Sequence, residues 1–206
     1  MEIRWDWIGR HRDDIADALL GHLELTAISL AIAVAVALPL ALAVRRRRTA
    51  AAAVVGVAGV LYTIPSIALF GLLVPIIGLG IWPVIIGLVL YAQLTLLRNT
   101  LVGLEAAPAP VREAATGMGL TPRQVLLKVE LPLAVPAIVA GLRVATVTAV
   151  GIATVGGLVG GGGLGQIIVD GVRRDFPTLI VVGAVCTTAL AVLLDLLLLA
   201  AERLGQ

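Results

Sequence analysis

The feature that most constrains this chain is a long stretch, from Thr49 to Leu97, that contains no charged side chain. A helix needs about 20 apolar residues to cross the hydrocarbon core of a bilayer, so this stretch is long enough for two crossings. Residues that favour turns interrupt its middle and predict a tight turn between two spans; they are Pro75, Gly78, Gly80 and Pro83. The chain is therefore expected to lie in a membrane.

Composition supports the same conclusion, because 60% of the 206 residues are hydrophobic and only 14% are charged. A soluble domain of this size is much more polar. We predict about five transmembrane helices, near residues 24–44, 50–75, 81–98, 132–157 and 177–201. These segments are apolar on all sides, whereas the strands of a membrane barrel alternate between apolar and polar residues. The predicted fold is therefore an all-α membrane protein.

Residues 1–23 are expected to form an extracytoplasmic or interfacial segment, followed by a transmembrane domain over residues 24–206. The first 24 residues contain six acidic residues and three Arg, which is the wrong charge for a secretory signal, so no cleaved signal is expected. Apolar side chains recur at helical spacing, at Ile15, Ala18, Leu19 and Leu23. This pattern fits a short helix in the membrane interface and, equally well, an N-terminal extension of the first span.

Basic residues predict the orientation, because Lys and Arg near the ends of spans favour the cytoplasmic side. Arg45 to Arg48 directly follow the first span, which places the N-terminus outside and both residues 99–131 and the C-terminus inside. Amphipathic rings then fall near the outer interface, at Trp5, Trp7, Trp82 and Phe176. For the Arg run itself, a simple stop-transfer anchor without a partner is the favoured interpretation.

The predicted inner loop, residues 99–131, is less apolar than its surroundings. It is too long for a turn between helices and too short for a domain of its own, so a partner is expected to dock there. Helix-forming residues from Val111 to Ala115 predict a short helix, and Gly119 can adopt the positive φ that ends it. Thr121 and Pro122 fit the N-cap and the first position of a second helix.

This loop resembles the EAA loop in the permease subunits of type I, binding-protein-dependent ABC importers. In that loop, Glu-Ala-Ala is followed by Gly six residues after the Glu. Ten residues after the Gly come a branched apolar residue, any residue, Leu and Pro. The matching positions are Glu113, Ala114, Ala115, Gly119, Val129, Leu131 and Pro132.

The resemblance implies the type I permease fold and a coupling helix that sits in a cleft of a cytoplasmic ABC ATPase subunit. An ordinary helical hairpin is the alternative interpretation of the same segment. The residues expected to couple this chain to the ATPase are Glu113, Ala114, Ala115, Thr116, Gly117, Met118, Gly119 and Leu120.

Further motifs are similar to those of the osmoprotectant branch of these permeases, although related amino-acid permeases share several of them; they are Thr63–Ser66, Gly117–Gly119, Val129–Ala134, Gly141–Arg143 and Gly161–Gly165. The resemblance implies a translocation path for glycine betaine, choline or carnitine that works by alternating access in a bacterial inner membrane. It also implies a second permease, as a homodimer or heterodimer, and an extracytoplasmic solute-binding protein. ATP-Mg would be bound by the ATPase, so this chain is expected to have no cofactor, enzymatic activity or nucleic-acid partner.

Two segments are candidates for the translocation path or its gate. Pro65 lacks a backbone N–H within the predicted second span, so the helix should kink between Tyr62 and Ser66, either to line the path or to adjust packing. The glycines from Gly156 to Gly165 lack the Gly-Lys-Ser/Thr ending of a phosphate-binding loop. They favour tight helix packing or a re-entrant turn, with an outer gate at Gly161, Gly162 and Gly163 as the alternative.

Two charged residues lie within the predicted spans. Arg143 follows Pro132 by 11 residues, about 16 Å along a helix, where an unpaired charge is unfavourable. Asp195 precedes Glu202 by seven residues, about 10 Å along the last span. We predict a structural ion pair between Arg143 and Asp195, with snorkelling of each side chain to the interface as the alternative.

Other classes of membrane protein are disfavoured. Both His residues lie within the first 22 residues and no acidic cluster falls within the spans, which disfavours an intramembrane enzyme or a metal site. Cys186 is the single cysteine, so it supports neither a disulfide nor a Cys-based metal site. Two alternatives stay open, namely an amino-acid permease of the same fold and a membrane scaffold that docks an ATPase without transporting a solute.

Overall fold

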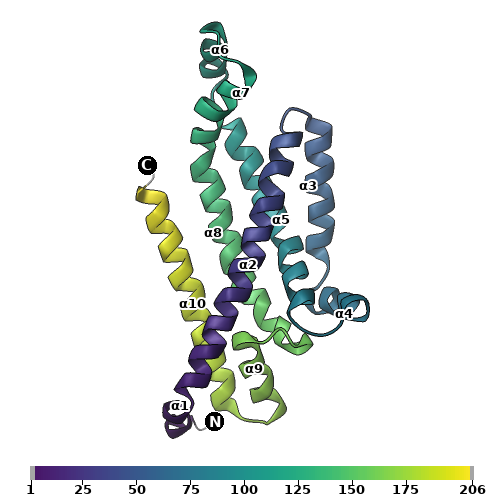
Figure 1. Ribbon diagram of the computed structural model, residues 1–206, viewed down its shortest axis with the longest axis vertical. Helices are drawn as coiled ribbons and strands as arrows, with labels where there is room; N and C mark the ends of the chain where they lie inside the picture. Colours follow the sequence, from purple (N-terminus) through teal and green to yellow (C-terminus); the bar gives the residue numbers. More distant parts are fainter. Residues whose placement is uncertain (1–2, 205–206) are drawn as a thin grey trace.

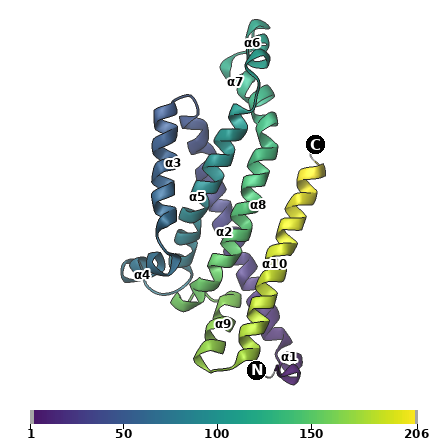
Figure 2. The same cartoon turned by 180° about the vertical axis from the view of Figure 1, so that it is seen from behind.

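The computed structural model describes residues 3–204, and within this range the chain is helical and contains no strand. Figure 1 and Figure 2 show the long helices running along the long axis of the molecule. Four helices are long and apolar enough to cross a membrane, and a fifth crossing results if the bent pair α3 and α4 counts as one span. The predicted all-α membrane fold with about five spans is confirmed.

The first span is longer at its N-terminal end than predicted. A short helix, α1 (Trp5–Arg10), precedes α2 (Arg12–Val44), whose 33 residues extend over about 50 Å. Residues 12–23 continue the same helix, which agrees with the predicted alternative of an N-terminal extension of the first span, and no structural break separates residues 23 and 24. The backbone stays helical across it because α2 contains no proline before Pro39.

The N-terminal residues pack against the start of the last helix, α10 (Pro177–Leu204). The indole of Trp7 stacks on the ring of His11 and meets the ring of Phe176 edge to face, with centroid distances of 4.2 and 5.8 Å. The backbone N–H of Arg4 donates to Thr178 Oγ1 at 3.1 Å. Two parts of the chain that are far apart in sequence are therefore joined at this end of the molecule.

The predicted second span, near residues 50–75, is not a single helix. It consists of α3 (Arg48–Thr63) and α4 (Ser66–Ile77), which are bent by 94° relative to each other. Pro65 provides no backbone N–H, and its ring favours an extended conformation at Ile64, where φ is −68° and ψ is 126°. The kink expected at Pro65 is present, and it is a complete break that turns α4 sideways (Figure 1).

A side chain from the next helix supports this break. Helix α5 (Ile81–Glu105) follows α4 after a tight turn in which Gly78 and Gly80 both have positive φ. The hydroxyl of Tyr91 in α5 donates a hydrogen bond to the carbonyl oxygen of Ile64. It therefore satisfies an acceptor at the point where the helix is interrupted.

The centre of the molecule is the pair formed by α5 and α8 (Leu131–Val155). More than half of the apolar stretch of α5 is buried, a larger share than in the other candidate spans. Glycines let the two helices approach closely, because a Cβ on Gly103 would lie 2.9 Å from the carbonyl oxygen of Ala134. A Cβ on Gly141 would likewise lie 2.5 Å from Asn99 Cβ.

The glycine-rich segment forms a compact turn that returns the chain onto α8. It begins with one turn of 3₁₀ helix, η2 (Gly156–Val159), and leads into α9 (Gly163–Arg173), with positive φ at Gly160, Gly162 and Gly163. A Cβ on Gly165 would clash with the carbonyl oxygen of Thr154. Close packing of α9 on the end of α8 therefore requires glycine at this position.

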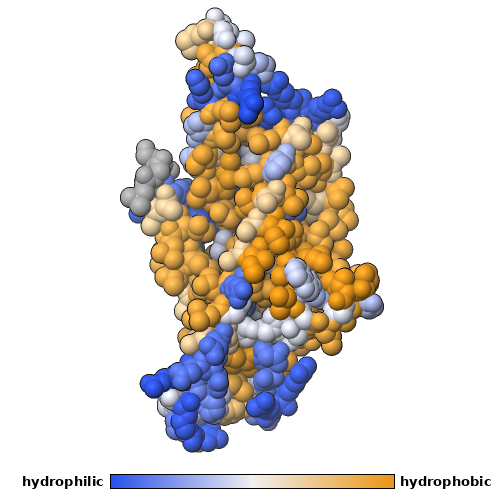
Figure 3. Space-filling view, in the orientation of Figure 1, coloured by the Kyte–Doolittle hydropathy of each residue, from blue (hydrophilic) through white to orange (hydrophobic). Residues whose placement is uncertain are grey.

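Apolar residues form a band around the middle of the face seen in Figure 3, and polar residues lie at both ends. One end contains α1 and α9. The other contains the α2–α3 loop with Arg45–Arg48, together with α6 (Ala109–Gly117) and α7 (Pro122–Val125) (Figure 1). This distribution fits a molecule whose middle lies in lipid and whose ends lie in water.

Gly165→Val should destabilise the protein because the added side chain has no space beside the Thr154 carbonyl group. Overpacking of this kind typically lowers the free energy of unfolding by about 1–3 kcal/mol. Gly151→Val is the matched control, because Gly151 is an exposed glycine of α8 with no neighbouring atom where the new side chain begins. Thermal unfolding of both variants in one detergent measures the difference, and equal melting temperatures would contradict this account of the turn.

Candidate functional site

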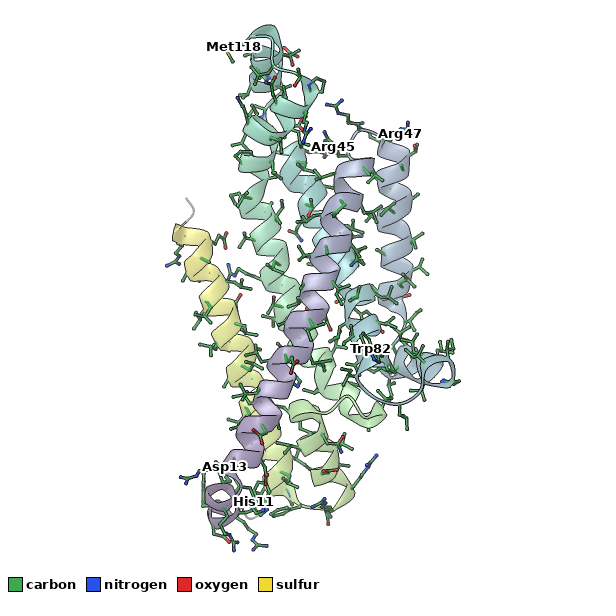
Figure 4. The ribbon with its side chains drawn as sticks, in the orientation of Figure 1. His11, Asp13, Arg45, Arg47, Trp82 and Met118 are labelled. Carbon is green, nitrogen blue, oxygen red and sulfur yellow. The ribbon has the colours of Figure 1, made fainter. Side chains whose placement is uncertain are left out.

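The candidate site is the segment between α5 and α8, which projects beyond the other helices at its end of the molecule. It contains α6, then α7, and then one turn of π-helix, η1 (Leu126–Glu130), which continues directly into α8. Figure 1 shows α6 farthest out at this end, and Figure 4 shows Met118 at its tip. A partner protein can therefore reach this segment.

Local hydrogen bonds define the end of α6. The N–H groups of Gly119 and Leu120 donate to the carbonyl oxygens of Thr116 and Ala115, at 2.9 and 3.2 Å. This pair of bonds is a Schellman motif, which needs a residue with positive φ, and the φ of Gly119 is +85°. The prediction that Gly119 ends the helix is confirmed.

A capping box then starts α7. Thr121 Oγ1 accepts from the N–H of Gln124 at 3.4 Å, and Gln124 Oε1 accepts from the N–H of Thr121 at 2.8 Å. Pro122 follows the cap, in the first turn, where its missing N–H breaks no helical bond. The predicted N-cap is confirmed, and the shape of the whole segment is set by residues within it.

Most of the residues predicted to couple to an ATPase are exposed. Ala115 is the exception, since it is only 3% exposed and anchors α6 to the rest of the segment, while Leu120 is half-buried. The exposed residues are Glu113, Ala114, Thr116, Gly117, Met118 and Gly119. Within residues 3–204, no basic side chain forms an ion pair with Glu113. The segment can therefore offer a free carboxylate and an apolar side chain to a docking protein.

The first group of predicted path residues lies at the α3–α4 break. Tyr62 and Pro65 are exposed and Ser66 is half-buried. The rings of Tyr62 and Tyr91 meet edge to face, with their centroids 5.9 Å apart. The break therefore exposes Tyr62 and packs it against the buried ring of Tyr91, and Figure 4 shows Trp82 near α4.

The second group, in the glycine-rich turn, is engaged in packing. A Cβ on Gly161 would lie 2.7 Å from Val84 Cγ2, and one on Gly163 would lie 3.0 Å from the Cα of His22. Gly162 is half-buried and has no atom within 4 Å of the place where a Cβ would be. In this conformation two of the three glycines allow close approach of neighbouring helices.

Arg143 lies between two acidic residues of α10. Its Nε and Nη2 atoms lie 2.9 and 3.2 Å from the carboxylate oxygens of Asp195, and its Nη1 lies 3.0 Å from Glu202 Oε2. The structure thus brings Arg143 and Asp195 together and adds Glu202, whose role the sequence analysis missed. The two acidic residues are seven positions apart on one helix, which places them on the same face, and this spacing could have identified Glu202.

Two other buried polar contacts were also missed. Arg45 Nε lies 3.6 Å from Glu130 Oε2, where the end of α2 meets η1. His22 is completely buried, and its Nε2 lies 3.1 Å from the carbonyl oxygen of Val150. Each contact joins residues far apart in sequence, so no local spacing indicates it.

Among the described residues, no cluster of three or more His, Cys, Asp or Glu side chains is arranged to hold a metal ion.

Arg143→Asp should lower the melting temperature more than Asp195→Asn, because it places three carboxylates together without a cation, whereas Asp195→Asn keeps the contact with Glu202. Adding Asp195→Arg to Arg143→Asp should restore part of the loss. Thermal unfolding in detergent measures both effects, with Arg123→Gln as the exposed control. A charge exchange that restores nothing would show that the attraction between these residues does not contribute to stability.

The fold is similar to solved transporter structures. The inward-facing methionine ABC transporter MetNI matches with a TM-score of 0.80 at 26% identity, over 93% of this chain and 96% of that chain. A chain of an amino acid ABC transporter with histidines matches with a TM-score of 0.82 over 98% of this chain and 99% of that chain, and its 16% identity supports the fold alone. The type I ABC permease fold implied by the EAA loop is confirmed.

Several curated relatives share more sequence with this chain. The choline transport system permease protein OpuBB of Bacillus subtilis is 39% identical over 73% of this chain and 69% of the relative. The osmoprotectant import permease protein OsmW of Salmonella typhimurium is 39% identical over 70% of each chain. The glycine betaine/carnitine/choline transport system permease protein OpuCD of Bacillus subtilis is 44% identical over 73% of this chain and 66% of the relative.

The family described as binding-protein-dependent transport system inner membrane component matches residues 25–204. This range contains nearly all of the described structure, from the middle of α2 to the end of α10, including the projecting segment and the Arg143 contacts. The resemblance that rested on the EAA loop therefore extends over the whole transmembrane region. This chain belongs to the family of binding-protein-dependent transport system inner membrane components.

Proposed function

We propose that this chain is the permease subunit through which an ABC importer carries a quaternary-ammonium osmoprotectant, namely glycine betaine, choline or carnitine. The names of relatives at 39–44% identity support this class of solute. The family and the fold support the transport role and the location in a bacterial inner membrane.

The observation that carries the proposal is the exposed, locally defined α6 segment at one end of an apolar helix bundle. An ABC ATPase subunit docks there on residues Glu113 to Leu120. Val111 and Met118, which are 44% and 74% exposed, provide apolar area that a cleft in the partner can bury. Because α7, η1 and α8 follow one another without a loop, helical backbone connects the docked segment to a central helix.

ATP-Mg is bound and hydrolysed by that separate ATPase subunit. A phosphate-binding loop needs Gly-Lys-Ser/Thr, and the single lysine of this sequence, Lys128, is followed by Val. The description of the family names a binding protein as the component on which transport depends. We therefore assign high-affinity recognition of the solute to an extracytoplasmic solute-binding protein. The Helicobacter pylori relative EgtU is named as both a permease and a binding protein, so that relative combines the two roles in one chain.

Transport proceeds by alternating access between two permease subunits, either identical or related. The α6 end faces the cytoplasm and the α1 end faces outward, in agreement with the basic residues beside α6 at Arg45–Arg48. The solute then enters from the end that contains the α3–α4 break and the glycine-rich turn. Residues Tyr62, Pro65 and Ser66 line the path there, and Gly161, Gly162 and Gly163 form the adjoining gate.

An amino-acid permease of the same fold is the second candidate, and the match to MetNI at 26% identity favours it. The osmoprotectant assignment is preferred because the relatives named for choline, betaine and carnitine are 38–44% identical. A membrane scaffold that docks an ATPase without transport is the third candidate, and it differs from both in predicting no uptake.

Uptake into proteoliposomes tests the class of solute. The vesicles contain this chain with the ATPase and the binding protein encoded beside it, and radiolabelled glycine betaine, choline, carnitine, proline and methionine are supplied in turn. We expect ATP-dependent uptake of at least one of the first three and none of methionine. Uptake of methionine alone would replace the osmoprotectant assignment, and uptake of no solute by vesicles with a bound ATPase would favour the scaffold.

Glu113→Arg should reduce uptake at least tenfold in the same vesicles, because it reverses the one free carboxylate that α6 presents to the ATPase. Gly119→Ala should have a smaller effect of the same sign, because a Cβ is strained at a φ of +85°. Glu105→Arg is the control, since Glu105 is exposed and lies before the segment. Co-purification of the ATPase with each variant shows whether docking is lost, and full uptake by Glu113→Arg would contradict the docking site.

A further inference from the structure

The end of α2 is joined to the base of the projecting segment by one ion pair. Arg45 Nε lies 3.6 Å from Glu130 Oε2, and the two side chains are only 19% and 12% exposed. Figure 4 shows Arg45 and Met118 at the same end of the molecule. The pair therefore connects the first span to the place where the segment enters α8.

The guanidinium group of Arg45 is held in position by its own helix. Arg45 Nη1 donates to the carbonyl oxygen of Leu42 at 2.7 Å, which keeps the guanidinium group close to the end of its own helix. Arg45 Nε is buried and has no hydrogen-bond partner within the described residues, so Glu130 provides its nearest compensating charge. Glu130 occupies the position at which the EAA motif accepts any residue, so the motif assigns it no role.

The helical backbone that connects α7 to α8 is irregular at Glu130. Residues Leu126–Glu130 form a π turn, and the N–H of Leu131 bonds to the carbonyl oxygen of Leu126. A π turn inserts an additional residue into the helix and is frequent at functional sites. Pro132 and Pro136 also lack the N–H groups that would stabilise the first turns of α8. Bending between the segment and α8 is therefore easiest here.

We propose that the Arg45–Glu130 ion pair ties this hinge to α2, so that a displacement of the ATPase-docking segment moves α2 and α8 together. Arg45 and Glu130 are positioning residues, since neither contacts the solute or the nucleotide. The proposal rests on the proposed function, in which the segment receives its movement from an ATPase. Without the ion pair, the same displacement bends η1 and is lost before it reaches the membrane.

The test compares the number of solute molecules imported per ATP hydrolysed in proteoliposomes of the complete transporter. Arg45→Gln and Glu130→Gln should each lower this ratio at least fivefold while the ATPase still hydrolyses ATP. The exchange Arg45→Glu/Glu130→Arg should recover a substantial part of it. Arg46→Gln is the matched control, because Arg46 is the exposed neighbour of Arg45 and forms no ion pair among the described residues. Unchanged ratios in both single variants, or an equal loss in Arg46→Gln, would overturn the proposal.

A single variant can fail to assemble because it leaves one charge unpaired, whereas the double variant Arg45→Gln/Glu130→Gln leaves none. The double variant is therefore measured in parallel and should also have a low ratio. A normal ratio in the double variant would limit the pair to a structural role and overturn the proposal.

A second measurement does not depend on the solute, and so separates failure of this inference from failure of the proposed function. Spin labels are placed at Arg123→Cys in α7, outside the residues that dock the ATPase, and at Ala43→Cys, both exposed positions, in a Cys186→Ser background, and the distance between them is measured with and without nucleotide in the ATPase-bound complex. The wild-type distance should stay narrow in both states. In Arg45→Gln the distance between the labels should broaden or shift when nucleotide binds. An unchanged narrow distance distribution would overturn the proposal that the ion pair couples the hinge to α2.

Discussion

In a bilayer every backbone N–H and C=O group must find a partner within the protein, and the rest of this structure depends on that constraint. The described chain meets it with helices and departs from helical geometry only where another group supplies the missing bond. Tyr91 donates to the carbonyl oxygen of Ile64 at the α3–α4 break. The N–H of Gly80 donates to the carbonyl oxygen of Val159 at 2.8 Å, where the α4–α5 turn meets the glycine-rich turn. The α3–α4 break is thus held by α5, the most buried span, and the α4–α5 turn and the glycine-rich turn are held by each other.

Burial within the protein decides where charges are allowed. Arg143 and Arg45 extend from different helices, and each is compensated by carboxylates that belong to another part of the chain. Because an unpaired charge is strongly unfavourable there, the pairs fix which helices must remain neighbours. Arg143 holds α8 to α10 within the bundle, while Arg45 holds α2 to the base of the projecting segment. Helix α8 therefore has two electrostatic contacts, one at its junction with the segment and one farther along its length.

Features with local causes could be predicted from the sequence, and features with distant causes could not. The spans follow from uncharged runs, the end of α6 from Gly119, and the start of α7 from Thr121 and Pro122. A kink could be predicted from Pro65, but neither its 94° size nor the hydrogen bond from Tyr91 of α5 to Ile64 follows from the local sequence. The pairing of Arg45 with Glu130 requires α2 and η1 to be brought together by the fold. The π turn itself carries no sequence signature, since Leu126 to Glu130 reads as ordinary helix.

Helix α6 is ended by hydrogen bonds within its own segment, and this preformed structure affects how an ATPase can recognise this protein. A flexible loop loses about 1–2 kcal/mol of backbone entropy for each residue that a partner orders. The nine residues of α6 have already lost that freedom during folding, so association starts from a preorganised surface. In the proposed function, the ATPase then recognises one short helix whose conformation is set before docking by residues of the segment itself.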